Sequence, residues 1–213
     1  MKVALIGSTG PVGKRLLNEL VERGHQVTAI SRSVGNITET SQVKAAEADV
    51  HDSESLAKAL KGHDAVISAI RFLKVDYAKL IAGVKASGVK RYLIVGGAAS
   101  LFAPGTTTKL IDGGMIPEEY LPEPTAGVAF FSELKKEKEL DWTFLSPPVL
   151  FTNDEDYGDP AAGGRTGVFR LGLDELIVAE NGDSSISYED YAVAMIDELE
   201  NPKHSQIRFT VGY

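Results

Sequence analysis

The sequence predicts an α/β protein built on one parallel β-sheet, and three observations support this prediction. Short apolar segments alternate with amphipathic helical segments through the first half of the chain, a spacing typical of βαβ units with right-handed crossovers. The apolar segments contain few polar residues, as expected of strands buried on both faces of a sheet. A glycine-rich turn also separates the first apolar segment from the first helical segment.

The expected elements follow one another at short intervals. We expect strands at residues 3–6, 27–30, 43–48, 65–70, 92–95, 142–145 and 207–211, and helices at 11–23, 52–61, 75–87, 126–140 and 188–200. Asp52 is a candidate N-cap, and Ser187 begins a capping-box-like pattern. Residues 166–171 and 175–179 resemble a hairpin, with Gly172 in the connection.

The 213 residues are expected to form a single domain, residues 1–213, because this length supplies one sizeable core. Residues 97–124 are rich in Gly and Pro, and a connection of that length is usually functional. We expect residues 97–124 and 150–185 to form loops on the substrate side of the sheet. Together they would make a small C-terminal subregion over the substrate.

Composition excludes several classes of function. The chain has no Cys, and its four His show no metal-ligand spacing, so we expect no metal site. No apolar run approaches the roughly 20 residues that span a bilayer, and the start is too short for a signal peptide. The net charge of −8 argues against nucleic-acid and anionic-membrane partners. We therefore expect a cytoplasmic monomer or homodimer that acts on a small-molecule substrate.

The strongest chemical signal is the glycine-rich turn. It comprises Gly7, Ser8, Thr9, Gly10, Pro11, Val12 and Gly13. The first glycine allows a tight turn, the second lets a pyrophosphate approach the backbone, and the third lets the helix pack against the strand. An ordinary βα turn is the alternative, but the position between the first strand and the first helix favours dinucleotide binding.

The end of the second strand favours NADP(H) over NAD(H). A carboxylate that would bind the ribose 2′-hydroxyl is missing from the segment around Arg32 and Ser33. Arg32 can instead pair with a 2′-phosphate, and Ser33 can donate a hydrogen bond to it. A solvated surface arginine is the alternative interpretation of Arg32.

Further candidate cofactor contacts follow the next strands of the predicted sheet. Asp49 and Val50 follow the third strand, where the Asp49 carboxylate could accept from the adenine amine or simply belong to a loop. The fourth strand ends in Ser68, Ala69 and Ile70, which lie at the sheet edge where ligands of open α/β folds bind. Ser100 follows the fifth strand and is placed either to touch nicotinamide or substrate, or to cap the following loop.

At this point the chain resembles a known family, the atypical short-chain dehydrogenase/reductase proteins with an NAD(P)-binding, Rossmann-type doubly wound sheet. It is similar to the NADH-flavin reductase, biliverdin reductase B-like and NmrA-like groups. The matching segments are residues 7–13, 64–69, 92–100, 141–148 and 165–192, so the resemblance extends over nearly the whole chain. The resemblance implies that Pro147 and Pro148 line the nicotinamide.

One departure from this superfamily concerns its catalytic residues. Typical members combine a Ser with Tyr-x-x-x-Lys, in which the Tyr transfers a proton while hydride moves. Ser100 matches the Ser and Lys135 matches the Lys, but Phe131 stands where the Tyr is expected. Ser100 and Lys135 are therefore the candidate catalytic residues, with Tyr120 and Ser132 as weaker candidates for proton donation.

These observations predict an NADP(H)-dependent oxidoreductase that transfers hydride to a planar acceptor such as a flavin or quinone. Such acceptors delocalise charge and need less help from a positioned acid than a simple ketone does. Aromatic residues that could form a wall for a flat substrate are Phe102, Phe130, Phe151 and Tyr157. Two alternatives remain: a non-catalytic, NmrA-like NADP(H) sensor, and a relative of the sugar-nucleotide epimerases and dehydratases.

Overall fold

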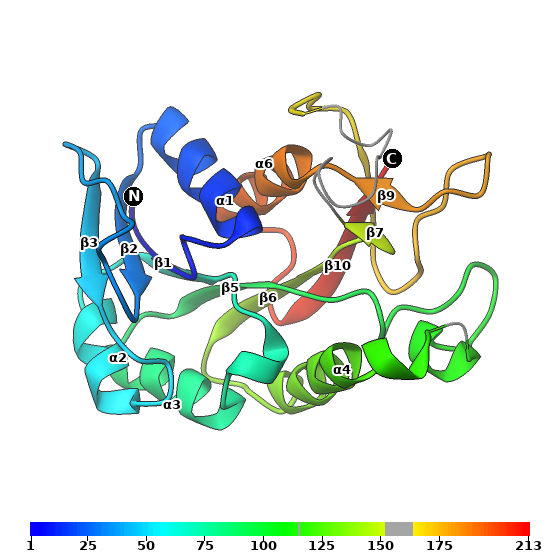
Figure 1. Ribbon diagram of the computed structural model, residues 1–213, viewed down its shortest axis with the longest axis horizontal. Coiled ribbons are helices and arrows are strands. Elements are labelled where there is room, and N and C mark those ends of the chain that lie inside the picture. Colours follow the sequence, from blue (N-terminus) through cyan, green and yellow to red (C-terminus); the bar gives the residue numbers. More distant parts are fainter. Residues whose placement is uncertain (115, 152–163) are drawn as a thin grey trace.

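The structure is a computed structural model that describes residues 1–114, 116–151 and 164–213, and its centre is an eight-stranded sheet (Figure 1). Along the sheet the strands are β3 (Val43–Glu47), β2 (Gln26–Ser31), β1 (Lys2–Ile6), β4 (Ala65–Ser68), β5 (Arg91–Val95), β6 (Asp141–Ser146), β10 (Ile207–Gly212) and β8 (Arg170–Gly172). Neighbouring strands pair in parallel except β8, which is antiparallel to β10. The strand order reverses between β1 and β4, and ligands of open α/β sheets bind at such a reversal.

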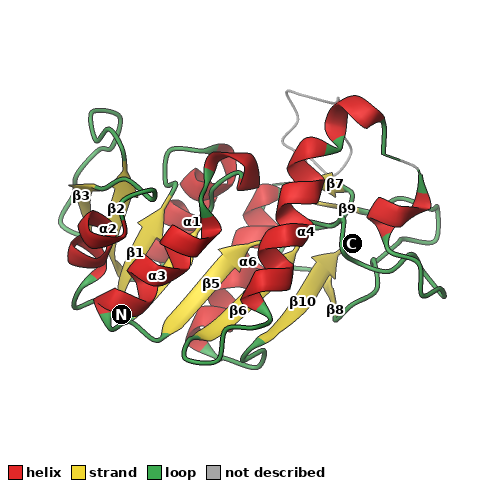
Figure 2. Ribbon diagram, turned by 90° about the horizontal axis from the view of Figure 1, so that it is seen from below, coloured by secondary structure: helices red, strands yellow, loops and turns green. Residues whose placement is uncertain are grey.

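Helices cover both faces of the sheet, so the predicted doubly wound α/β architecture is confirmed (Figures 1 and 2). One face carries α1 (Pro11–Glu22) and α6 (Tyr188–Glu200), and the other carries α2 (Ser53–Leu60), α3 (Tyr77–Ser87) and α4 (Pro122–Leu134). Each helical layer encloses its own hydrophobic core against the sheet. Among the described helices, none combines the length and the apolar character needed to cross a membrane.

Side-chain caps explain where several helices begin. The Asp52 carboxylate accepts hydrogen bonds from the backbone N–H groups of Glu54 and Ser55, and the Ser187 hydroxyl accepts from the backbone N–H of Asp190. The Asp190 carboxylate does not complete a capping box. It accepts from the backbone N–H groups of Thr166 and Gly167 instead, and so ties a distant segment to the start of α6.

A second, smaller group of elements lies beside the carboxyl end of the main sheet, where the substrate-side subregion was predicted. It contains the parallel pair β7 (Leu150–Phe151) and β9 (Ser185–Ile186), and the short 3-10 helices η2 (Leu110–Gly113) and η3 (Glu118–Tyr120). Figure 2 shows β7 and β9 beside the amino-terminal part of α4. Part of the predicted loop 150–185, residues 152–163, lies outside the described residues.

The predicted hairpin of residues 166–171 and 175–179 is wrong. The described strand in this region is β8, which pairs with β10 rather than with residues 175–179. Asp174 is held by an ion pair with Arg208 of β10, and Glu175 forms a single bridge with Phe102. Both segments therefore attach to distant parts of the chain, which the local alternation of residues could not reveal.

The helix predicted at residues 126–140 is displaced toward the amino end. It begins at Pro122, because proline suits the first helical position, where its missing N–H leaves no bond unmade. It ends at Leu134, after which the Glu137 carboxylate accepts from the backbone N–H of Glu139 and competes with helix continuation.

A buried carboxylate on α1 makes stability depend on pH. Glu19 is buried and pairs with Arg23 and Arg165 at 2.7 and 2.8 Å. The hydrogen bond from Arg165, together with that from Arg23, holds the pKa of Glu19 below its usual value of 4.5. Since the folded state favours the ionised form, this stabilisation is present above pH 4.5 and disappears as the pH falls through the lowered pKa.

We expect Glu19→Gln to lower the free energy of unfolding at pH 7 by about 2 kcal/mol, because the three hydrogen bonds from Arg23 and Arg165 lose their carboxylate acceptor. Urea denaturation of both proteins between pH 7 and pH 3 measures the difference. It should shrink below pH 4.5, and a difference that is independent of pH would contradict this role for Glu19.

Candidate functional site

The glycine-rich turn packs so closely that two of its positions exclude a side chain. Gly7 has a φ of +85°, and a Cβ there would lie 2.3 Å from the Ala69 carbonyl oxygen at the end of β4. A Cβ on Gly13 would lie 2.0 Å from the Gly7 carbonyl oxygen. The turn, the first turn of α1 and the end of β4 are thus in direct contact, and side chains at these positions would separate them.

The amino end of α1 presents backbone N–H groups without a side-chain cap. Gly10 is the N-cap residue and supplies no side-chain hydrogen bond, Pro11 is the first helical residue, and the first turn contains no acidic residue. An uncapped helix start has a partial positive charge and suits a phosphate. A Cβ on Gly10 would meet only the Gly7 oxygen, at 3.6 Å, so open space lies beside it. These residues fit the pyrophosphate of a dinucleotide.

The two remaining side chains of the turn differ in exposure. Ser8 is buried and its hydroxyl has no hydrogen-bond partner among the described residues, whereas Thr9 is exposed beside Gly10. Val12 is partly buried against the core beneath α1. Of these three predicted contacts, Thr9 is therefore the one whose side chain is freely available to a ligand.

The ends of β2 and β3 place Arg32 near Asp49. Arg32 and Ser33 are exposed. Among the described residues, Arg32 forms no ion pair. The hydrogen bond from the backbone N–H of His51 lowers the pKa of Asp49, with the His51 ring and Arg32 adding to this effect. Val50 is buried in the core beside α2 and α3.

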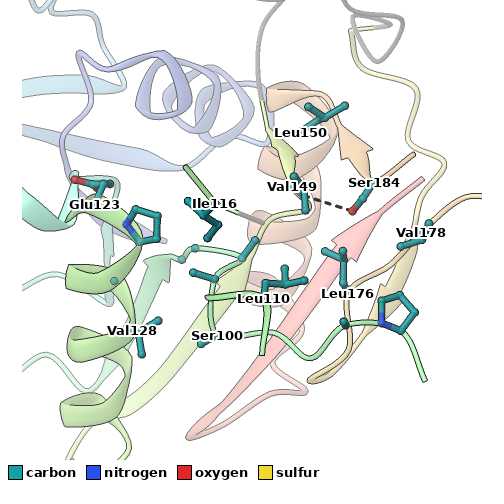
Figure 3. Close-up of a pocket in the computed structure, with 18 of the residues that line it drawn as sticks. Ser100, Leu110, Ile116, Glu123, Val128, Val149, Leu150, Leu176, Val178 and Ser184 are labelled. Atoms are coloured by element: carbon teal, nitrogen blue, oxygen red, sulfur yellow. Dashed lines mark hydrogen bonds between the residues drawn. The ribbon is translucent and has the colours of Figure 1, made fainter. Parts of the chain in front are cut away.

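A cleft of about 720 Å³ lies at the carboxyl ends of β5 and β6 (Figure 3). Residues 96–100, which follow β5, form its base, and the amino-terminal part of α4 forms one side. The opposite side comes from residues 149–150, 176, 178 and 182–184. The cleft is therefore enclosed by the segments that the sequence predicts as substrate-side loops.

Ser100 lines this cleft, and its hydroxyl is held from behind by Arg208. The Arg208 Nη1 donates to the Ser100 Oγ at 2.7 Å, and the Arg208 Nε donates to Asp174 at 2.9 Å. The guanidinium also lies 4.8 Å from the centre of the Phe131 ring. Because Arg208 can only donate, the Ser100 oxygen is the acceptor, and its own hydrogen stays available for another partner.

The other predicted contacts around the cleft have mostly structural roles. The Ser68 hydroxyl is buried and pairs with the Tyr92 hydroxyl at 2.9 Å, so it faces the core. Ala69 and Ile70 are partly exposed beyond it. Pro147 and Pro148 are buried and lead from β6 to Val149 and Leu150, which line the cleft.

The structure does not bring Lys135 to the site. Lys135 follows the last residue of α4, whereas Val128 is the last α4 residue on the cleft. Two helical turns, about 10 Å along the axis, separate them. The Lys135 Nζ lies instead 5.1 Å from the centre of the Phe131 ring, which is buried against the sheet. Arg208, at a distant position in the sequence, is the cation that contacts Ser100.

The other candidate side chains also lie elsewhere. Tyr120 is 64% exposed on η3, and Ser132 donates its hydroxyl to the Val128 carbonyl. Phe130 belongs to the core, and Phe151 packs on Tyr191 of α6. Phe102 is absent from the cleft lining as well, and Tyr157 lies outside the described residues.

Among the described residues, Phe72 is the aromatic residue that lines the cleft, and sequence reasoning missed it. It begins the 3-10 helix η1 (Phe72–Lys74) and packs over Gly127, where a Cβ would lie 2.8 Å from its ring. Its position two residues after Ile70, close to the end of the fourth strand, was the available signal. Sequence reasoning also missed Tyr191, which supports the base of the cleft from α6. Its buried hydroxyl donates to the Leu145 carbonyl and accepts from the backbone N–H of Gly96.

Comparisons with known proteins agree with this geometry. A family model described as NAD(P)H-binding matches residues 7–202. The Bacillus subtilis protein YwnB, which is uncharacterized, is 41% identical to this chain, and the match covers 99% of this chain and 98% of YwnB. Both matches extend over the glycine-rich turn and the cleft.

Solved structures resemble the chain over its full length. A Bacteroides thetaiotaomicron protein, provisionally named an epimerase, is 46% identical with a TM-score of 0.90, covering 100% of this chain and 96% of that one. A Streptococcus pneumoniae protein, provisionally named an NADH-flavin reductase, is 35% identical with a TM-score of 0.82, covering 100% and 99%. Together with the uncapped glycine-rich turn at the sheet reversal, these matches establish that the chain belongs to the NAD(P)H-binding family.

Proposed function

We propose that this protein is an NADP(H)-dependent reductase of a planar organic acceptor such as a flavin or quinone. The observation that carries the proposal is the apolar cleft at the carboxyl ends of β5 and β6, which opens beside the expected nicotinamide position. A flat ring could enter this cleft and lie against the cofactor. The provisional name of the Streptococcus pneumoniae relative is consistent with such an acceptor.

The chain's own residues bind and orient the two reactants. Arg32 would pair with the ribose 2′-phosphate and the turn at Gly10 with the pyrophosphate, while the base of the cleft would receive the nicotinamide. The cofactor would therefore extend across the sheet from β2 to β5, over β1 and β4. At the usual strand spacing, β2 and β5 are about 14 Å apart. When bound, the reduced cofactor supplies a hydride, and one proton from water completes the two-electron reduction of a quinone or flavin.

Ser100 is the group placed to assist at the acceptor. Its hydroxyl hydrogen is free to donate because Arg208 already donates to its oxygen. A hydrogen bond to an acceptor oxygen or nitrogen that gains negative charge during hydride transfer would stabilise that charge. The cleft excludes much of the solvent, which strengthens such a bond.

The experiment that tests the proposal follows loss of NADPH absorbance with purified protein, a flavin and a small panel of quinones. Parallel reactions use NADH. Saturable turnover with at least one acceptor is expected. Tight NADPH binding without turnover on any acceptor would overturn the reductase proposal in favour of an NADP(H) sensor.

A variant at Arg32 tests the choice of cofactor. We expect Arg32→Glu to weaken NADPH binding by about 100-fold while changing NADH binding by less than about threefold, because only NADPH carries the 2′-phosphate. Fluorescence titration with each cofactor gives the two dissociation constants. Lys61→Glu makes the same charge change at an exposed position after α2 and serves as the control. Equal losses of affinity for NADPH and NADH would contradict recognition of the 2′-phosphate by Arg32.

The epimerase alternative has less support in the site. A sugar nucleotide carries a diphosphate, yet no Lys or Arg occurs among the described residues of the cleft lining. The Glu123 carboxylate, which is one of the acids on the cleft, accepts from the backbone N–H groups of Phe72 and Leu73. It is therefore committed to holding η1 rather than free to move a proton.

A further inference from the structure

We infer that the cleft selects an uncharged, apolar acceptor without a phosphate group, and that it discriminates against anionic acceptors such as flavin mononucleotide. The inference rests on the proposed reductase function and adds the chemical class of its substrate. It follows from three features: the apolar walls of the cleft, the absence of cations among its described lining residues, and the carboxylates at its edge.

The walls of the cleft are formed mainly by apolar side chains that come from several elements. Figure 3 shows Leu110, Val128, Val149, Leu176 and Val178 around one cavity. Phe72 adds an aromatic ring above Gly97 and Gly127. Burying an apolar ring system against such walls is favourable, whereas a charged group there loses hydration without compensation.

The polar side chains in the lining provide little for an anion. The Ser184 hydroxyl donates to the Ile177 carbonyl at 2.7 Å. The Ser184 oxygen in turn accepts from the backbone N–H of Val149 (Figure 3). Ser100 has one hydrogen to donate, which suits a single neutral carbonyl oxygen. The other polar side chains of the lining are carboxylates: Glu123, which is partly buried, and Asp183, which is exposed.

The nearby cations are directed elsewhere or already paired. Arg208 lies behind Ser100 and is neutralised by Asp174. Arg71 lies 3.7 Å from Glu123, is 73% exposed and is not part of the lining. Lys109 precedes the lining residue Leu110 but does not itself line the cleft. A phosphate near the edge would therefore meet carboxylates before it met an unpaired cation.

The segment outside the described residues cannot supply the missing charge. Residues 152–163 contain Asp154, Glu155, Asp156 and Asp159, and no Lys or Arg. Met115 is uncharged. The net charge of −8 for the whole chain adds further repulsion of anions at long range.

Riboflavin and flavin mononucleotide provide the sharpest test, because they share one ring system and differ by a phosphate. With saturating NADPH, we expect kcat/KM for riboflavin to exceed that for flavin mononucleotide by about 30-fold or more, a difference of about 2 kcal/mol. We likewise expect kcat/KM for a neutral naphthoquinone to exceed kcat/KM for its sulfonated counterpart. Equal kcat/KM values within each pair would overturn the inference and leave the reductase function standing.

A lysine introduced into the cleft should reduce the preference for riboflavin over flavin mononucleotide. Val149 lines the cleft and is 58% exposed, so Val149→Lys adds a cation without burying it. We expect this variant to narrow the riboflavin preference at least fivefold by raising kcat/KM for flavin mononucleotide. Val168→Lys is the matched control, because Val168 is 76% exposed and does not line the cleft. An unchanged preference in Val149→Lys would contradict the charge argument.

A binding measurement tests the selectivity of the cleft separately from the reductase activity. Quenching of flavin fluorescence on titration with NADP⁺-saturated protein reports binding without turnover. Tighter binding of riboflavin without reduction would retain the selectivity of the cleft and reject the reductase. Failure of both flavins to bind in this titration would reject flavins as the acceptor class.

Discussion

Replacing Gly13 with Ala should lower the free energy of unfolding by about 2–4 kcal/mol and abolish measurable NADPH binding. The new Cβ would lie 2.0 Å from the Gly7 carbonyl oxygen and 3.0 Å from the Ser8 Cα. Both are backbone atoms, which cannot rotate away as the end of a flexible side chain can. The start of α1 must therefore move away from the turn, which strains the fold and displaces the N–H groups expected to bind phosphate. Urea denaturation and NADPH fluorescence titration measure the two effects.

Two other glycines provide the controls for this experiment. Gly10 has an ordinary extended backbone, and its Cβ would have 3.6 Å of clearance, so Gly10→Ala should retain nearly all stability. It should still weaken NADPH binding about tenfold or more, because its methyl group would occupy the space through which phosphate approaches. Gly113→Ala, in open space on η2, should change neither property. Normal NADPH binding by Gly10→Ala would place the phosphate away from this turn.

Replacing Ser100 with Ala should reduce kcat about 30-fold and leave the dissociation constant for NADPH nearly unchanged. The variant removes the hydroxyl that Arg208 holds toward the cleft, and with it a hydrogen bond that strengthens as charge develops on the acceptor. Steady-state kinetics over a range of acceptor concentrations separates kcat from KM. Ser100→Thr keeps the hydroxyl and should recover most of the lost rate.

Ser184 offers a matched control on the same cleft. Its hydroxyl is already used in a bond to the Ile177 carbonyl, so Ser184→Ala should lower stability by about 1 kcal/mol and change kcat by less than about threefold. Arg208 acts as a positioning residue, and Arg208→Lys should reduce kcat less than Ser100→Ala does, because the charge remains and the forked geometry is lost. If Ser100→Ala and Ser184→Ala reduce kcat equally, the donor role of Ser100 is wrong.

Local sequence patterns were sufficient for much of the architecture. The alternating apolar and helical segments placed β1, β2, β4 and β5 and the helices between them, because each βα unit carries its own signals within a few residues. Asp52 and Ser187 were identified as caps from their neighbours alone, and both accept the expected backbone hydrogen bonds. The glycine-rich turn could be located in the same way, since its steric demand arises between residues close in sequence.

Predictions that depended on distant partners were less successful. Lys135 matched a family motif but lies two helical turns from the cleft, while Arg208, which contacts Ser100, had no local signal. Ser68 was expected at the cofactor, but the buried Tyr92 hydroxyl draws its hydroxyl into the core. Each outcome depends on which side chains the folded sheet brings together, and one sequence contains no direct record of those contacts.

The sequence by itself determined the doubly wound α/β sheet, the position of the glycine-rich turn, the absence of cysteine and the net charge of −8. Periodicity, capping and glycine sterics act over a few residues, so they can be interpreted without the fold. Only the tertiary structure decided that the cleft is apolar, that Phe72 forms part of its wall and that Arg208 lies behind Ser100. Ser100 and Arg208 are 108 positions apart in the sequence, and they meet only because the folded sheet brings β10 close to the segment that follows β5.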